Sequence, residues 1–208
     1  MNKSQLIEKR HQIEQFKHNP HSLIQHSHVL GESIIRSWQR SARADIPKER
    51  MAAPLIRLDT QPSPLQHALT YCEDELKAIA AQANMVLAIA DVGSTILWSA
   101  AQGQMQREAE NVHFVQGGQW CEALVGTNAL ALSIKTEQSS WVFSNEHYMP
   151  SVQNWVCYAA PITDPYSKQI LGVVDLSTIW DQHNSLGVLA AERCAAIIQT
   201  ALLQCQRH

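Results

Sequence analysis

The sequence predicts an α+β fold, in which a central antiparallel sheet carries helices on one face. Apolar residues recur at helical spacing near both ends of the chain, and between them lie short apolar runs separated by turn residues. The resulting order is helix, two strands, a helical insert, three strands and a final helix. This order favours an antiparallel sheet, preceded by an N-terminal helical segment.

The helices follow from apolar periodicity and from residues typical of helix ends. Ser63 followed by Pro64 supplies an N-cap and a proline at the first helical position. Near the C-terminus, apolar residues from Leu186 to Cys205 form one stripe. Helices are therefore expected at residues 4–17, from 27 or 31 to 43, at 63–83, at 126–135 and at 184–206.

The strands follow from short apolar runs bounded by turns. Residues 85–90 and 95–98 flank Asp91-Val92-Gly93-Ser94, which predicts a hairpin. Further strands are expected at 140–144, 155–163 and 169–177. Because side chains alternate along a strand, Trp155, Cys157 and Ala159 should share one face, opposite Val156 and Tyr158.

Charge and composition divide the chain at about residue 60. Residues 1–60 carry ten Lys and Arg against six Asp and Glu, whereas residues 61–208 carry six against thirteen. We therefore expect an N-terminal helical arm (1–60) and an acidic sensing domain (61–208). The acidic balance argues against direct nucleic-acid binding by the second part. The arm's alternating charges are typical of a solvated helix face.

Several classes of protein are disfavoured by the sequence. No run approaches the ~18 apolar residues of a membrane span, and the N-terminus lacks the apolar region of a secretory signal. The five cysteines are scattered without a C-x-x-C pair, which favours free thiols and a cytoplasmic location. No phosphate-binding G-x-x-x-x-G-K-[ST] loop and no convincing DNA-binding module is found, so any output domain is expected to lie outside this chain.

The densest grouping of functional residue types lies between residues 114 and 134. Trp120, Cys121, Glu122 and Asn128 place an aromatic ring, a thiol, a carboxylate and an amide within nine residues. Small-molecule cavities combine apolar walls with a few polar groups of this kind. The alternative is that Asn128 caps a helix and Trp120 is a core residue.

Together with three downstream segments, this grouping matches a family pattern in order. The matching residues are Gly117, Trp120, Glu122, Gly126, Thr127, Asn128, Ala129, Glu146, His147, Cys157, Ala159, Pro161, Ile162, Asp164, Pro165, Gly172, Asp175 and Leu176. In this pattern the chain resembles the GAF sensor domain that opens sigma-54-dependent transcription activators of the acetoin- and glycerol-catabolism type. Arg36-Ser37-Trp38-Gln39-Arg40 resembles the helix that precedes the domain in that family.

The resemblance implies a non-enzymatic domain that binds a small metabolite and passes its ligand state through the terminal helices. The ligand-binding residues that it implies are Trp120, Cys121, Glu122, Asn128, His147, Tyr148, Trp155 and Cys157. After Ala129 the family pattern has a glycine and a threonine, where this chain has Leu130-Ala131-Leu132. The ligand itself is therefore left open.

Two other functions compete with this reading. One is a GAF-fold thiol enzyme or redox sensor resembling the free methionine sulfoxide reductases, with Cys121 or Cys157 as nucleophile and His147 as base. The other is an interaction scaffold that binds no ligand.

No metal or cofactor is expected. The possible metal donors Cys121, Cys157, His113, His147 and Glu146 are spaced irregularly. The N-terminal histidines (His11, His18, His21, His26 and His28) are interpreted as surface residues, and Asp175 as a structural residue.

The partners expected are an unidentified metabolite and a second copy of the chain, with no membrane. A two-fold homodimer would bury the apolar stripe of the last helix together with Leu6, Ile13 and Phe16 of the first. The alternative is that the N-terminal helices fold back over this stripe within one chain.

Overall fold

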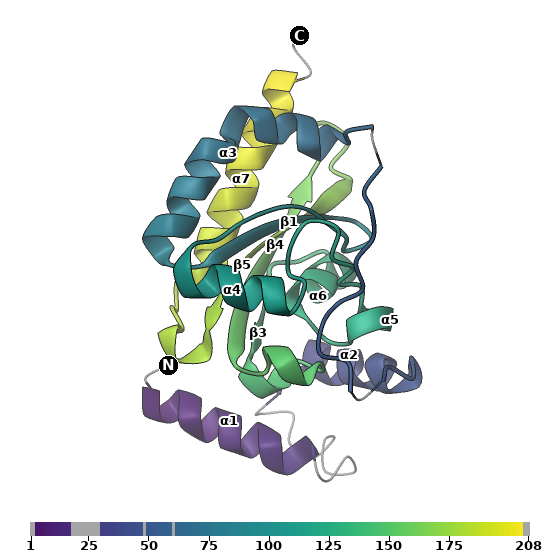
Figure 1. Ribbon diagram of the computed structural model, residues 1–208, viewed down its shortest axis with the longest axis vertical. Coiled ribbons are helices and arrows are strands. Elements are labelled where there is room, and N and C mark those ends of the chain that lie inside the picture. The colour runs from purple at the N-terminus through teal and green to yellow at the C-terminus, as the bar shows by residue number, and fades with distance from the viewer. Residues whose placement is uncertain (1–2, 18–29, 48, 60, 206–208) are drawn as a thin grey trace.

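The computed structural model describes residues 3–17, 30–47, 49–59 and 61–205. Its centre is a five-stranded antiparallel sheet in the order β2-β1-β5-β4-β3 (Figure 1). The strands are β1 Val86–Asp91, β2 Ile96–Ala100, β3 Ser140–Phe143, β4 Trp155–Thr163 and β5 Ile170–Ile179. The predicted α+β fold is confirmed, and the strand expected at 155–163 has these bounds.

Two long helices cover one face of the sheet. Helices α3 (Pro64–Ala83) and α7 (Gly187–Cys205) lie side by side across it (Figure 1). The predicted cap at the start of α3 is present: the Ser63 hydroxyl accepts from Gln66 N at 3.3 Å, and the Gln66 side chain accepts from Ser63 N at 2.9 Å. This capping box fixes where the helix begins.

Shorter elements cover the opposite face of the sheet. They are α2 (Glu32–Arg43), α4 (Gly103–Asn111), α5 (Glu122–Val125) and α6 (Ala129–Thr136). The two faces bury separate apolar cores, and the β4 side chains alternate between them. Trp155, Cys157 and Ala159 point into the core under α6, whereas Val156 and Tyr158 point into the core under α3 and α7. The predicted alternation is therefore confirmed.

The register of the central strands gathers polar groups on the α6 face. Cys157 pairs with Ser177 across β4 and β5, and Ala159 pairs with Asp175. Since paired residues point to the same face, Cys157, Ser177 and Asp175 lie together. Asp175 also pairs with Ala88 of β1, so it lies on the middle strand of the sheet.

Helix α1 (Lys3–Lys17) lies at the end of the molecule where β3 ends, beside the 3-10 turn η2 (Ser144–Glu146) (Figure 1). Leu6 and Ile13 are 4% and 0% exposed. The expectation that these two side chains take part in a dimer surface is wrong, because they are buried within the chain. The short turns η3 (Pro150–Val152) and η4 (Trp180–Gln182) complete the structure of this end.

Helix α2 packs against α5 and α6. Part of the predicted arm thus contacts the predicted sensing domain, and the boundary at residue 60 stays a prediction.

One helix of the described residues, α7, is long and apolar enough to cross a membrane by length and composition alone. Its residues Ala191, Cys194, Ile198 and Leu202 are buried in the core against α3 and the sheet. The apolar character of α7 is therefore explained by packing within the domain.

Candidate functional site

A small internal cavity lies between the sheet and the segments that cover its α6 face. Its volume is about 10 Å³, which is about enough to hold one water molecule. The lining residues are Phe114, Trp120, Asn128, Ala129, Leu130, His147, Val152, Trp155, Cys157 and Asp175. Five of the predicted ligand-binding residues are thus brought together: Trp120, Asn128, His147, Trp155 and Cys157.

Three aromatic rings form one wall of this cavity. The ring of Phe114 meets that of Trp120 at 4.9 Å and that of Trp155 at 5.7 Å, both edge to face. Trp120 is held in place by a hydrogen bond of 3.0 Å from its Nε1 to the carbonyl of His113. The wall is therefore apolar and tightly packed. Phe114 was not among the predicted site residues, although it opens the segment that carries Trp120.

Asn128 both lines the cavity and caps a helix. Its Nδ2 donates to the carbonyls of Trp120 and Gly126, each at 2.8 Å. Its Oδ1 accepts from Ala131 N at 3.0 Å, as the N-cap of α6. All three bonds go to the backbone, so Asn128 shapes the cavity wall rather than offering a free polar group to it.

His147 and Cys157 form a buried imidazole–thiol pair. Nε2 of His147 lies 3.2 Å from the Cys157 sulfur, and Nδ1 lies 2.9 Å from the carbonyl of Ser144. Because a carbonyl can only accept, Nδ1 carries a proton, and Nε2 of the neutral ring can accept from the thiol. Burial raises the pKa of the Cys157 thiol well above its ordinary value, and the Asp175 carboxylate adds to the effect. The thiol is therefore neutral near pH 7.

Asp175 places a carboxyl group beside this pair. Its Oδ1 accepts a short hydrogen bond from the hydroxyl of Ser177. Burial raises the pKa of Asp175 to about 7, although the bond from Ser177 acts in the opposite direction. Asp175 was expected to be structural, and it also lines the cavity. The alternation along β5 could have predicted this position. Val174 and Leu176 point into the core under α3 and α7, so Asp175 between them points to the cavity side of the sheet.

Cys121, Glu122 and Tyr148 lie away from this cavity. Cys121 and Glu122 line an open depression of about 330 Å³ at the surface beside α2. Glu122 accepts two hydrogen bonds from Arg40, at 2.6 and 2.8 Å, and one from Ser37 at 2.8 Å. These contacts hold α2 against α5, so Glu122 is already occupied by partners from its own chain.

Tyr148 packs against the turn that precedes α6. It packs against Gly126, where a built Cβ would lie only 2.4 Å from the Cβ of Tyr148. Tyr148 N also donates to the carbonyl of Thr127 at 3.2 Å. The residue therefore closes the loop around the cavity without lining it.

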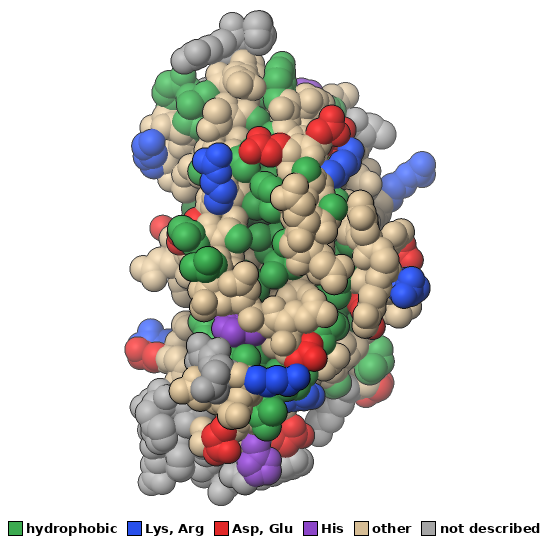
Figure 2. Space-filling model, turned by 90° about the vertical axis from the view of Figure 1, so that its left-hand side faces the viewer, with side chains coloured by type: hydrophobic (Ala, Val, Ile, Leu, Met, Phe, Trp, Pro, Cys, Tyr) green, Lys and Arg blue, Asp and Glu red, His purple; other side chains and the backbone are tan. Residues whose placement is uncertain are grey.

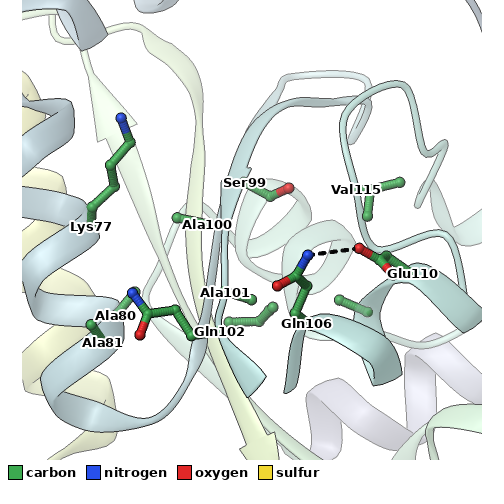
Figure 3. Close-up of a pocket in the computed structure, with 12 residues that line it drawn as sticks. Lys77, Ala80, Ala81, Ser99, Ala100, Ala101, Gln102, Gln106, Glu110 and Val115 are labelled. Carbon is green, nitrogen blue, oxygen red and sulfur yellow. Dashed lines mark hydrogen bonds between the residues drawn. The ribbon is translucent and has the colours of Figure 1, made fainter. Parts of the chain in front are cut away.

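A larger groove of about 390 Å³ lies beside the edge strand β2 (Figure 3). Lys77 of α3 lies on one side of the groove, and Gln106 and Glu110 of α4 lie on the other (Figure 3). Gln106 Nε2 donates a hydrogen bond of 3.0 Å to Glu110 Oε1. Small side chains such as Ala100 and Ala101 form its floor. None of the predicted site residues lines this groove.

No group of three metal-ligating side chains occurs within the described residues. Two of the possible donors have other partners: Glu146 pairs with Lys9 at 2.7 Å, and His113 contacts the carbonyl of Ala53 at 2.7 Å. Among the N-terminal histidines, His18, His21, His26 and His28 lie outside the described residues.

Comparison with known proteins relates this chain to transcriptional activators. Residues 9–199 match the family model of the MimR N-terminal domain. The propane 2-monooxygenase operon transcriptional activator MimR of Mycolicibacterium goodii is 29% identical over 178 residues, which cover 84% of this chain and 30% of the relative. The acetoin dehydrogenase operon transcriptional activator AcoR of Bacillus subtilis is 30% identical over 156 residues, which cover 71% of this chain and 26% of the relative.

A solved structure agrees with this relationship. A chain of the E. coli DhaR(N)–DhaL complex aligns with a TM-score of 0.75 at 20% identity, over 84% of this chain and 61% of that one. At this identity the likeness shows the fold alone. The chain spans about a third of the length of the curated relatives it matches. On the family match, the chain belongs to the family of the MimR N-terminal domain, a sensor domain of transcriptional activators.

Proposed function

We propose that this domain binds a small metabolite in the cavity beneath Trp120 and Trp155, and that ligand binding alters the packing of helices α1 and α2. The observation that carries this proposal is the buried polar cluster of His147, Cys157 and Asp175 at the cavity. Burying polar groups costs free energy unless they gain partners. A purely structural core would fill this space with apolar side chains, whereas a binding site requires polar groups there.

The present cavity is a closed form that must widen to admit a ligand. The wall around His147 consists of the 3-10 turns η2 and η3 and the loop between them. Hydrogen bonds such as Ser144 Oγ to Gln153 O, at 2.9 Å, hold this wall. Short turns of this kind open at lower free energy than the strands of a sheet. We therefore assign the η2–η3 wall as the moving part.

The same wall connects the cavity to the N-terminal helices. Nε1 of Trp38, in α2, donates to the carbonyl of Glu146 at 2.7 Å. The Glu146 carboxylate pairs with Lys9 of α1 and accepts from Phe143 N at 2.7 Å. Since Glu146 directly precedes His147, a ligand that displaces His147 would disturb both helices. This supports transmission of the ligand state through α1 and α2.

We further propose that the domain is not an enzyme. The thiol of Cys157 is neutral and buried, whereas catalytic thiols are stabilised as thiolates. Its relatives are named as transcriptional activators of operons for propane 2-monooxygenase and acetoin dehydrogenase. By analogy, this chain would regulate an operon from the cytoplasm without touching nucleic acid or membrane through the described part.

We also keep the homodimer as part of the proposal. Leu186, Leu189 and Tyr71 are 61%, 61% and 52% exposed on the α7 and α3 side. Figure 2 views the molecule from the side on which α3 lies, and hydrophobic side chains gather along the middle of that view. Exposed apolar surface of this kind favours association with a second copy.

The ligand proposal is tested by thermal melting of the full chain against a library of small metabolites. A ligand at about 100 times its Kd stabilises by about 2.7 kcal/mol, or roughly 5–10 °C for a domain of this size. We expect the shift to disappear in His147→Ala and to persist in His183→Ala. His183 is a matched control, because it lies on the other face of the sheet, 2.7 Å from Tyr158 Oη. A shift that both variants retain would contradict the assignment to this cavity.

A further inference from the structure

We infer that the open depression beside α2 is a second binding site, which takes a small aliphatic carboxylate and holds it between α2 and α6. Its volume is about 330 Å³, and it shares no lining residue with the internal cavity among the described residues. Helix α2 packs against α5 and α6 at this place (Figure 1). The lining residues come from α2 and its end, the β1–β2 turn, α5 and α6, and they are Arg40, Ala44, Ser94, Cys121, Glu122, Ala123, Ala131, Ile134 and Lys135.

The hydroxyl group of Ser94 indicates that this depression accommodates a ligand. Ser94 is 3% exposed and lines the depression. Its backbone is satisfied, since N donates to Asp91 O at 2.9 Å and O accepts from Trp120 N at 2.8 Å. Its hydroxyl has no hydrogen-bond partner among the described residues. The unpartnered side-chain atoms that are fully enclosed in this part of the chain are Arg50 Nε and Ser151 Oγ. The Ser94 hydroxyl is not one of them, so it opens onto the depression, where a ligand oxygen would give it a partner.

Two cationic side chains at the depression have donors available for an anion. Arg40 uses Nε and Nη2 to bind the Glu122 carboxylate, at 2.6 and 2.8 Å, which leaves Nη1 without a partner among the described residues. Lys135 lies exposed in the last turn of α6, with no acidic partner in the described part of the chain. The lining thus carries two positive charges and one negative charge, a net charge of +1. This balance favours a monoanion over a dianion, a neutral molecule or a cation.

The rest of the lining suits a short alkyl chain. It consists of Ala44, Ala123, Ala131 and Ile134, and Ile134 is only partly buried where it packs on the core. An inorganic anion would leave this apolar surface in contact with water, whereas a branched alkyl chain would cover it. The volume is at the lower end of the range for small-molecule sites. The depression therefore fits a small aliphatic carboxylate better than a bare ion.

A carboxylate bound here would link two helices. Arg40 belongs to α2 and Lys135 to α6, so a ligand that contacts both binds fully only while α2 is docked. Binding of this kind stabilises the docked position of α2 by the difference in affinity between the two states. The site would thus give the domain a second chemical input, whether or not the internal cavity binds a metabolite.

The test uses the thiol of Cys121 as a reporter, because Cys121 lines the depression and is partly exposed. Alkylation of the full chain by iodoacetamide at pH 7 is followed by peptide mass spectrometry, with and without isovalerate. Isovaleramide and isopentylammonium have similar shapes and serve as the neutral and cationic comparisons. Cys205, which is also partly exposed, lies on α7 and is the internal reference. We expect millimolar isovalerate to slow alkylation of Cys121 in a saturable way and to leave Cys205 unchanged. The other two probes should require at least about fivefold higher concentrations.

Two variants assign the binding to named side chains. Lys135→Gln should weaken the protection by isovalerate about two- to fivefold, the range for an exposed ion pair. Lys77→Gln removes the same charge from the groove beside β2 and should leave the protection unchanged. Ser94→Gly removes the hydroxyl at a position whose φ of +60° suits glycine. It should weaken the protection about tenfold, as expected for a hydrogen bond to a charged group. Melting curves establish that each variant is folded, and Lys135→Gln decides the question if Ser94→Gly is not.

A further variant separates this site from the internal cavity. His147→Ala should lose the response expected of that cavity and keep the protection of Cys121. Loss of protection in His147→Ala would place the isovalerate in the internal cavity and overturn the inference. The inference would also fail if isovalerate gave no protection, if isovaleramide protected equally well, or if both Lys135→Gln and Ser94→Gly kept full protection. The proposed function would stand after any of these three results, because thermal melting tests it independently.

Discussion

At the residue scale, the buried carboxyl of Asp175 makes stability depend on pH in an unusual direction. The native pKa is about 7, against an ordinary value of 3.8. The folded state therefore binds this proton more tightly than the unfolded state. The contribution is fully present below about pH 4 and is lost as pH rises through about 7. A shift of about three pH units corresponds to at most about 4 kcal/mol.

We expect the free energy of unfolding of the wild type to fall, relative to Asp175→Asn, as pH rises from about 4 to about 7. Urea denaturation at a series of pH values measures this difference. Burial also raises the pKa of Glu146, which acts in the same direction. Glu146 is present in both proteins, so its effect cancels in the comparison. A difference independent of pH would mean that Asp175 titrates normally.

The cysteines provide a second prediction at this scale. Cys121 and Cys205 are partly exposed, whereas Cys72, Cys157 and Cys194 are buried. Burial raises the pKa of Cys72 and of Cys194 to about 11 and that of Cys157 well above 9.0. Iodoacetamide at neutral pH should therefore modify Cys121 and Cys205 first, as read by peptide mass spectrometry. Unfolded protein, in which all five react, is the control. Fast labelling of Cys157 would instead indicate a thiolate and revive the thiol-enzyme hypothesis.

At the element scale, the turn between α5 and α6 has little tolerance for change. Gly126 has a φ of +77°, and a Cβ built there would lie 2.4 Å from the Cβ of Tyr148. Gly103 also has a positive φ, of +58°, but nothing lies within 4 Å of its Cβ position. Gly103→Ala should therefore cost only the backbone strain, roughly 1–2 kcal/mol.

Gly126→Ala should cost about 3 kcal/mol or more, because overpacking adds roughly 1–3 kcal/mol to the same strain. Urea denaturation of both variants isolates the effect of Tyr148. Equal destabilisation would show that the loop moves aside without cost.

The docking of α1 is a further prediction at this scale. Lys9 Nζ lies 2.7 Å from Glu146 Oε1, and the Glu146 side chain is 3% exposed. Removing one partner of a buried ion pair leaves an uncompensated charge, at a cost of about 3–5 kcal/mol. Lys9→Met should approach this cost at pH 7 and cost less near pH 5, where more of Glu146 is protonated. Lys3→Met, at an exposed position of the same helix, is the matched control.

How far the sequence determines these elements varies with their apolar content. The strand at 155–163 and the helix that begins at Pro64 were predictable. Alternation marks the strand, and an N-cap serine followed by proline marks the start of the helix. Helix α4 was not assigned separately, since only Met105 and Ala109 are buried in a polar segment. A stretch with two buried residues carries little periodicity.

The candidate site was predictable where regular elements fix the direction of side chains. Trp155 and Cys157 follow from strand alternation. Asn128 was expected from its grouping with Trp120, and the alternative, a helix cap, is also observed. Cys121 and Glu122 lie outside the cavity, and between them and Asn128 the backbone turns at Gly126 with a positive φ. Tyr148 directly follows His147, whose backbone is extended, so the two side chains point in different directions. Spacing in sequence does not reveal directions through such a turn.

At the scale of the whole molecule, the homodimer would depend on the few apolar side chains that α7 leaves exposed. Cys194, Ile198 and Leu202 of the predicted stripe are buried within the chain, whereas Leu186 and Leu189 are each 61% exposed. If the dimer forms through this end of α7, replacing both leucines with serine should shift sedimentation at micromolar concentration toward monomer. Val92→Ser, at a position 56% exposed in the β1–β2 turn, is the control. A wild-type chain that sediments as a monomer would remove the hypothesis.

The alternation of strand β4 also bears on how such a domain can diverge. Odd-numbered residues such as Trp155 and Cys157 meet the cavity, and even-numbered ones such as Val156 and Tyr158 meet α3 and α7. Substitutions on the two sides of the strand contact different neighbours, so their energetic effects should be nearly additive. One side can accumulate changes that suit a new metabolite while the helix packing on the other stays intact. If the cavity is a binding site as proposed, this separation would let its specificity change on one scaffold, and it tells a protein engineer which positions to randomise together.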